Sequence, residues 1–345
     1  MTGVFEQALL GTAVGDSLGL PAEGLSAGRI ARKWPGPWRH RLLGNRGMVS
    51  DDTEHTVFVA QSLLASRGDT AVFQRHLASK LRLWLLCLPA GIGFATLRAI
   101  IKLWLGFPPS RSGVYSAGNG PAMRSAVIGV YFANDPRTLV EFVSASTRLT
   151  HTDPRAEIGA MAIALTAAWA VQNSGDPDPV EIRELWLSAG AENREWREIV
   201  ETLVNAHAKG DSVNAVAQDF GLEKGISGFV FHSVPIALYS WLCHHRDFRG
   251  SLESVLQCGG DTDTVGAMTG ALAALHAPIP EEWLKPIRDY PVSRTYLVEL
   301  ARSMEASCEG DGAPPPRFCW LLLPARNLFF LLVVLFHGFR RLIPL

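Results

Sequence analysis

The sequence predicts an all-α protein with one large helical domain and a hydrophobic C-terminal tail. Apolar residues recur at helical spacing along most of the chain, which indicates amphipathic and buried helices. Runs that alternate between apolar and polar residues, as half-buried strands do, are short and few. Two Asp-Pro pairs, Asp135-Pro136 and Asp153-Pro154, match the N-cap and first-turn positions at which helices begin. Together these observations favour a fold of a dozen or more helices.

Seven segments carry the clearest helical pattern. The segment from Pro154 is long and mostly apolar, so we expect a buried helix that ends at a Ser-Gly pair. The segment ending at Gly210 is amphipathic, whereas the one around Pro235 is apolar on nearly all sides and is expected to kink at that proline. In chain order the seven segments are 3–19, 50–66, 69–89, 93–107, 154–175, 191–210 and 227–245.

Composition excludes several classes of protein. With 345 residues, 48% of them apolar, the chain can bury a sizeable core, and global disorder is not expected. The formal net charge of −1 gives no large basic excess, so no specific nucleic-acid binding is expected. The five cysteines are scattered and form no CxxC pair, which disfavours disulfides and structural zinc and indicates a reducing compartment. The N-terminus lacks a basic region and carries Glu6, so it does not resemble a secretory signal, and a cytoplasmic location is expected.

A segment rich in proline and glycine divides the chain. We expect a helical body at 1–306, a linker at 307–318 and a hydrophobic segment at 319–345. The uninterrupted apolar run in the last segment is 328–336, which as a helix covers about 14 Å, roughly half of a bilayer core.

Two interpretations of this tail remain open from the sequence. Pro324, Arg326 and Asn327 are poor lipid-facing residues, which favours a helix packed on the body of the protein or on a partner. Arg340 and Arg341 would suit the surface of a membrane, which favours a C-terminal membrane attachment.

Two acidic clusters, about 200 residues apart, stand at the start of expected helices. The first is Ser50-Asp51-Asp52-Thr53, and the second is Asp261-Thr262-Asp263-Thr264, which follows two glycines. Helix capping explains part of the pattern, because Asp and Thr accept backbone N–H groups and acids suit the positive end of the helix dipole. Asp51-x-x-Glu54 also resembles a capping box. Capping needs only one such residue per helix, however, and each cluster has four.

A divalent-metal site would explain why each cluster has more acidic and hydroxyl residues than capping needs. Asp16 and Glu23 add two further acids in a glycine-rich segment near the N-terminus. Carboxylates and hydroxyls are the hard oxygen ligands that Mg²⁺, Mn²⁺ and Ca²⁺ prefer, and the lack of Cys/His pairs disfavours zinc. Carboxylates brought together without cations would repel one another and raise each other's pKa. If the clusters meet in the fold, metal binding is the simplest explanation, and two divalent ions side by side are a familiar arrangement for hydrolysis.

Five motifs, in this order, resemble the ADP-ribosylglycohydrolase family. They are GTAVGDSLGLPAEG, SDDTEHT, SAGNGPAMRSA, LTHTDPRAEIGA and CGGDTDTVGAMTGALAAL, and the resemblance covers roughly residues 4 to 300. The SDDT and GGDTDT motifs are fairly specific, whereas GNG alone is weak. The resemblance implies an all-α, orthogonal multi-helix single domain, in agreement with the helical pattern.

The resemblance also implies a binuclear centre of two Mg²⁺ or Mn²⁺ ions. Glu23 would gate this centre, and Asp16 would hold the loops. The segment 118–124 would wrap the diphosphate and adenosine side of ADP-ribose, because successive backbone N–H groups suit phosphate oxygens. The implied metal ligands are Ser50, Asp51, Asp52, Asp261, Asp263 and Thr264, and the implied substrate contacts are Gly118, Asn119, Gly120, Met123 and His151.

The implied activity is hydrolysis of the C1″ glycosidic bond that links ADP-ribose to a protein or to a small molecule. The metals would orient the distal ribose and lower the pKa of the attacking water. One of Glu23, Asp51 and Asp52 would be the catalytic residue that transfers protons. Three alternatives remain open: a non-catalytic, Mg²⁺-dependent ADP-ribose-binding relative, a hydrolase of a small conjugate such as O-acetyl-ADP-ribose, and a Mg²⁺-dependent hydrolase of a phosphate ester.

Overall fold

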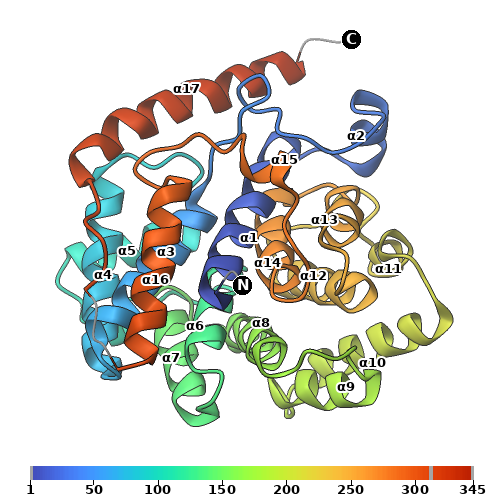
Figure 1. Cartoon of the computed structure of the whole chain (residues 1–345), viewed down its shortest axis with the longest axis horizontal. Coiled ribbons are helices and arrows are strands. Elements are labelled where there is room, and N and C mark those ends of the chain that lie inside the picture. Colours follow the sequence, from blue (N-terminus) through green and yellow to red (C-terminus); the bar gives the residue numbers. More distant parts are fainter. Residues whose placement is uncertain (1–2, 311–313, 343–345) are drawn as a thin grey trace.

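The computed structural model describes residues 3–310 and 314–342, and within them the expected all-α class is confirmed (Figure 1). Strand-like pairing in these ranges is limited to isolated bridges. The α-helices there are α1 (Val4–Gly19), α2 (Ala27–Lys33), α3 (Asp51–Ser66), α4 (Thr70–Leu86), α5 (Phe94–Trp104), α6 (Ala126–Tyr131), α7 (Pro136–Arg148), α8 (Pro154–Gln172), α9 (Pro179–Ser188), α10 (Arg194–Lys209), α11 (Val213–Asp219), α12 (Val230–His244), α13 (Phe248–Leu256), α14 (Thr262–Ala273), α15 (Glu281–Leu284), α16 (Arg294–Cys308) and α17 (Leu323–Leu342). Short 3₁₀ turns lie at Leu20–Ala22, Pro109–Arg111, Ala122–Arg124 and Trp320–Leu322.

The helix boundaries follow the local signals in the sequence. Asp135 and Asp153 cap α7 and α8 by accepting backbone N–H bonds of 3.2 Å and 2.9 Å, so both Asp-Pro pairs begin helices as expected. Helix α12 contains Pro235 in its interior and continues beyond it. Helix α16 ends at Cys308, inside the segment 307–318 that the sequence predicts to be a linker.

Helices α1 and α14 cross in the middle of the molecule with their backbones in direct contact (Figure 1). A Cβ atom at Gly15 of α1 would lie 1.9 Å from the carbonyl oxygen of Gly266 in α14. A Cβ atom at Gly11 would lie 2.2 Å from the carbonyl oxygen of Gly270, one turn along both helices. No side chain fits in these spaces, so the crossing depends on glycine at these positions.

This crossing gathers three distant segments at one end of the helix pair. Asp16 follows Gly15 on α1, and Asp261 immediately precedes α14. Thr262 Oγ1 donates a hydrogen bond of 2.8 Å to the carbonyl oxygen of Gly19, which joins the two helix ends. Helix α3 packs against α1 and begins beside Asp16.

The C-terminal helix α17 lies across one end of the body (Figure 1). The Asn327 side chain donates a hydrogen bond of 2.9 Å to the carbonyl oxygen of Cys87, at the end of α4. A small separate core joins α17 to the body, with Phe330 and Val333 packed against Leu20, Leu42 and Met48. One face of the tail therefore packs on the protein, as the first of the two interpretations requires.

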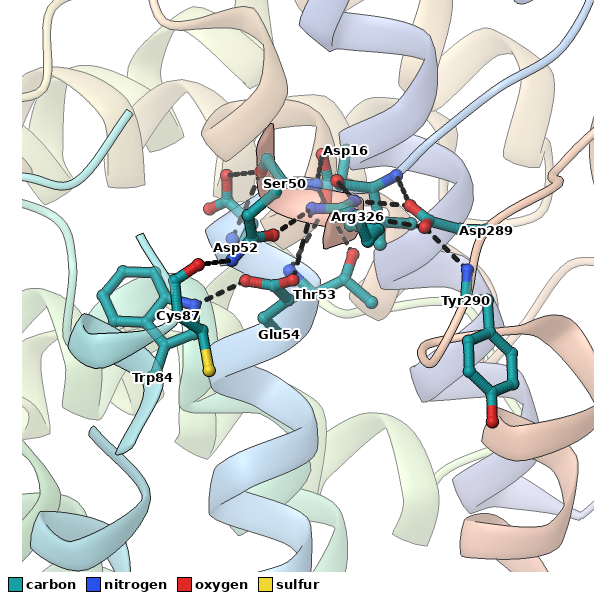
Figure 2. A network of polar contacts seen from close by, with 12 residues as sticks. Asp16, Ser50, Asp52, Thr53, Glu54, Trp84, Cys87, Asp289, Tyr290 and Arg326 are labelled. Atoms are coloured by element: carbon teal, nitrogen blue, oxygen red, sulfur yellow. Dashed lines mark hydrogen bonds and ion pairs between the residues drawn. The ribbon is translucent and has the colours of Figure 1, made fainter. Parts of the chain in front are cut away.

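Arg326 is the buried cation that fastens α17 to the body (Figure 2). Its guanidinium donates to Asp289 Oδ1 at 2.9 Å and lies 3.3 Å from Glu54 Oε1, and it also donates to the carbonyl oxygen of Val49. The side chains of Arg326, Glu54 and Asp289 are only 9%, 3% and 1% exposed. Burial raises the pKa of Glu54 to about 7, while Arg326 acts in the opposite direction.

Replacing Gly15 with alanine tests the helix crossing. Gly15→Ala is expected to lower the free energy of unfolding by more than about 1 kcal/mol, because the steric cost exceeds the gain in helix propensity. Urea unfolding followed by circular dichroism measures it. Gly28→Ala on α2 is the control, since a Cβ atom there would meet nothing within 4 Å. Equal stability of the two variants would contradict the crossing.

Replacing Arg326 with methionine tests the attachment of α17. Arg326→Met leaves two buried carboxylates without a cation and is expected to cost about 3–5 kcal/mol in free energy of unfolding. Arg246→Met is the control, because Arg246 and its partner Asp176 are 61% and 72% exposed, and the loss should be about 1 kcal/mol or less. A loss no larger than that of the control would show that Arg326 is not needed to fasten the helix.

Candidate functional site

The first acidic cluster is held in place by Asp16. The backbone N–H groups of Ser50 and Thr53 donate to Asp16 Oδ2 at 2.8 Å and 3.2 Å, and the Thr53 hydroxyl donates to the same oxygen (Figure 2). Burial raises the pKa of Asp16 to about 6, and the hydrogen bonds from Thr53 and Ser50 oppose this shift. Asp16 thus occupies the loop-holding position expected of it.

The capping box that Asp51-x-x-Glu54 resembles in the sequence does not form at the start of α3. The N-cap is Ser50, whose Oγ accepts a 3.2 Å bond from the backbone N–H of Asp52. Glu54 does not reach back to the cap; its Oε2 accepts a 2.6 Å bond from Trp84 Nε1, and its Oε1 faces Arg326. The first turn of α3 therefore carries more acids than capping uses.

The second cluster begins at two glycines whose backbone requires them. Gly259 and Gly260 have φ of 74° and 84°, and a Cβ atom at Gly260 would lie 1.9 Å from the carbonyl oxygen of Ile226. Asp261 occupies the N-cap position of α14, but its side chain accepts no bond from the helix backbone. Its Oδ2 instead accepts a 2.6 Å bond from Asn119 Nδ2. Capping therefore does not explain this carboxylate.

The two clusters meet, although about 200 residues separate them. Thr264 Oγ1 donates to Asp52 Oδ2 at 3.3 Å, and Ser50 Oγ donates to the same oxygen at 3.0 Å. In the described part of the chain, Asp52 Oδ1 and Asp263 Oδ1 are buried without a hydrogen-bond partner. Burial, followed by repulsion from neighbouring carboxylates, raises the pKa of Asp51, Asp52 and Asp263 well above the usual range.

A cleft of about 310 Å³ opens above the two clusters. Of the predicted site residues, Ser50 and Asp52 are absent from the lining, and they lie next to it through their hydrogen bonds with each other and with Thr264. The predicted residues that line the cleft are Glu23, Asp51, Asp261, Asp263, Thr264, Gly118, Asn119, Gly120, Met123 and His151. The structure thus brings the whole predicted set together.

The loop of Gly118 and Gly120 lies directly against His151. A Cβ atom at Gly118 would lie 3.1 Å from His151 Nε2, and one at Gly120 would lie 3.3 Å from His151 Cε1. The backbone N–H of Asn119 donates to the carbonyl oxygen of Gly228 at 3.0 Å, which anchors the loop. Burial, with a smaller effect of the Arg124 charge, lowers the pKa of His151 to about 3, so its imidazole is neutral at physiological pH.

Arg124 is a buried residue to which the sequence analysis gave no role of its own. Its side chain is fully buried, and its Nη2 donates to Thr150 Oγ1 and to the carbonyl oxygen of Ser146, both at 2.9 Å. Thr150 Oγ1 lies 2.9 Å from His151 Nδ1. Because Arg124 can only donate, the Thr150 hydroxyl accepts from it, and the same hydroxyl donates to the carbonyl oxygen of Thr147 at 3.5 Å. Arg124 and Thr150 thus hold the His151 ring in position, with its Nε2 atom beside Gly118.

The oxygen atoms at the two clusters fit hard divalent cations. The set offers carboxylates and hydroxyls, and two of its buried carboxylate oxygens lack partners. Within 3–310 and 314–342, no group of three or more His, Cys, Asp or Glu side chains is already arranged to hold a metal ion. The fit therefore rests on the donor chemistry and on the unpaired oxygens.

Comparisons with known proteins point to one family. The sequence model described as ADP-ribosylglycohydrolase matches residues 5–314. A protein of Archaeoglobus fulgidus is 32% identical over 315 residues, which cover 87% of this chain and 95% of that protein. ADP-ribosyl-[dinitrogen reductase] glycohydrolase of Rhodospirillum rubrum is 29% identical over 313 residues, covering 87% and 93% of the two chains. Human ADP-ribosylhydrolase ARH3 is 27% identical over 236 residues, covering 58% and 63%.

The fold agrees with these sequence matches. A solved structure described as an ADP-ribosylglycohydrolase-related protein complex superposes with a TM-score of 0.64 at 27% identity, covering 87% of this chain and 96% of the other. The family match ends at residue 314, so α17 lies beyond it. Because the match spans nearly all of the helical body, this chain belongs to the ADP-ribosylglycohydrolase family.

Proposed function

We propose that this protein is a metal-dependent hydrolase that cleaves the C1″ glycosidic bond of an ADP-ribosylated protein or small conjugate and releases ADP-ribose. The observation that carries the proposal is the meeting of the two acidic clusters at one cleft. The glycine loop and His151 line the same cleft, so groups suited to cations and groups suited to a phosphorylated sugar lie side by side. Membership of a family of glycohydrolases supports hydrolysis as the reaction.

The cofactor in this proposal is a pair of Mg²⁺ or Mn²⁺ ions. Ser50, Asp51 and Asp52 would hold them from the first cluster, and Asp261, Asp263 and Thr264 from the second. When bound, the ions would offset the repulsion among the carboxylates and supply Lewis-acid polarisation of the ribose hydroxyls and of water.

The three candidate acids differ in their access to the cleft. Glu23 and Asp51 line it, whereas Asp52 does not line it and accepts a hydrogen bond from Thr264. Glu23 and Asp51 would therefore exchange protons with substrate and water. Glu23 is also exposed, which suits proton exchange with solvent.

The substrate in this proposal lies along the glycine loop. Gly118 and Gly120 let the loop lie directly against the imidazole of His151, and the backbone of the loop would approach the diphosphate. His151, with a neutral imidazole, would form a hydrogen bond with the ribose or the diphosphate. Met123 would contact the apolar parts of the nucleoside.

The activity test is incubation with arginine-linked and serine-linked ADP-ribosyl proteins and with O-acetyl-ADP-ribose, with Mg²⁺ or with EDTA. We expect release of ADP-ribose from one of them, lost with EDTA and restored by Mg²⁺, with mass spectrometry identifying the product. No release from any of them, together with Mg²⁺-dependent thermal stabilisation by ADP-ribose, would favour the non-catalytic binding relative instead.

The double variant Asp261→Asn/Asp263→Asn tests the metal ligands. It removes two charges from the cation site and is expected to weaken Mg²⁺ binding by at least about tenfold, measured by calorimetry, and to abolish release of ADP-ribose. Asp176→Asn/Asp178→Asn is the control, because these exposed acids have the same one-residue spacing. Intact Mg²⁺ binding and release in the first variant would refute the proposed ligands.

A further inference from the structure

Helix α17 differs from a usual surface helix, because its described polar side chains face the protein and its exposed side chains are apolar. Its polar side chains Arg326, Asn327 and His337 all bond to the body of the protein. Within 323–339, the exposed side chains are apolar, and most of them form a second stripe at i, i+3 and i+4 spacing. This outer stripe, continued into the preceding turn, consists of Leu321, Leu322, Leu328, Phe329, Leu332, Leu335, Phe336 and Phe339.

The outer stripe is long and well exposed. Trp320–Phe339 spans 20 residues, and an 18-residue stretch within it has a mean hydropathy of 1.8 and is only 22% buried. Leu321, Phe336 and Phe339 are 90%, 64% and 66% exposed. A continuous apolar surface of this kind is unfavourable in water and marks a surface that meets another apolar phase or a partner.

Two segments to which α17 bonds, and the C-terminal segment that contains α17, carry Lys and Arg residues but no Asp or Glu. Residues 24–50, 70–134 and 312–345 contain no Asp or Glu and carry six, seven and four Lys or Arg residues, which is 17 of the 32 in the chain. All 33 acidic residues therefore lie elsewhere. Helix α17 bonds to the first two of these segments, through the carbonyl oxygens of Leu42 and Cys87.

We propose that α17 docks this protein on an anionic lipid bilayer, with the helix lying flat and its outer stripe at the boundary between headgroups and acyl chains. The apolar stripe would enter the bilayer, and exposed arginines of 24–50, such as Arg39 and Arg46, would meet the anionic headgroups. The apolar stripe complements the acyl chains of an anionic membrane, and the basic residues complement its negative charge.

Contacts with the body favour the flat orientation over a membrane span. A spanning helix would carry Arg326 and Asn327 into the hydrocarbon and would leave Glu54 and Asp289 buried without their cation.

The charge distribution also favours lipid over a second copy of the chain. A two-fold dimer through α17 would bring the basic segments of both copies together, whereas an anionic surface neutralises them.

Vesicle flotation of the full chain tests the proposal, without any need for substrate. The wild type should float with vesicles of phosphatidylcholine and phosphatidylserine, and much less with phosphatidylcholine alone. Leu332→Glu/Phe336→Glu should lower the partition coefficient at least about tenfold. Val180→Glu is the control, because Val180 is a 67% exposed apolar residue of α9, a helix that lies far from α17 in Figure 1. Vesicle binding of this variant should be unchanged.

A variant outside the helix separates lipid binding from misfolding. Arg39→Gln/Arg46→Gln leaves α17 intact and should weaken binding only to vesicles that contain phosphatidylserine, as should high salt.

Failure of the wild type to float, or equal flotation of the Leu332→Glu/Phe336→Glu variant, would overturn the proposal. Resistance of the bound protein to alkaline carbonate would favour a spanning helix instead. A wild-type dimer that Leu332→Glu/Phe336→Glu converts to monomers, without vesicle binding, would assign the stripe to a second copy.

Discussion

The backbone contact between α1 and α14 is the constraint on which the site depends. Glycines at Gly11 and Gly15 let the carbonyl groups of α14 approach α1 where any side chain would hold them apart. The crossing therefore brings Asp16, near the C-terminal end of α1, close to the N-terminal end of α14. The loop that starts α3 is then bonded to Asp16, and the second cluster is carried on α14 itself. A wider crossing would separate the two clusters even if every acid were retained.

The fold buries several carboxylates close together beside this crossing, which is electrostatically unfavourable. Asp16, Asp52 and Glu54 are nearly fully buried within one short region, and burial disfavours their charged forms. Each of the first two is partly compensated by hydrogen bonds from backbone or hydroxyl groups, and Glu54 by the guanidinium of Arg326. Asp263 has a buried oxygen without such a partner among the described residues. Carboxylates whose pKa is raised by burial and by neighbouring like charges, as here, are typical of functional sites.

Much of the fold, and the membership of the site, could be predicted from the sequence. Helical periodicity and Asp-Pro caps gave the class and several boundaries, and the motif order gave the set of residues that share the cleft. Side-chain direction could not be predicted in the same way. Glu54 has the spacing of a capping box, yet it bonds to Trp84 and Arg326, which come from distant segments. Arg326 and Asn327 look like interruptions of an apolar run, and the structure shows that they face the body while the apolar residues of the outer stripe face outward.

The order of Arg326 and its partners along the chain has a consequence for biosynthesis. The ribosome makes Glu54 and Asp289 before Arg326, which follows them by 272 and 37 residues. Residues of the body can therefore begin to pack during synthesis while these two carboxylates still lack their cation. The segment from Val49 to Glu54, which carries the first acidic cluster, reaches its final charge balance only after Arg326 has been made and α17 has packed on the body. Packing of α17 and completion of the first acidic cluster are thus one event in the folding of this protein.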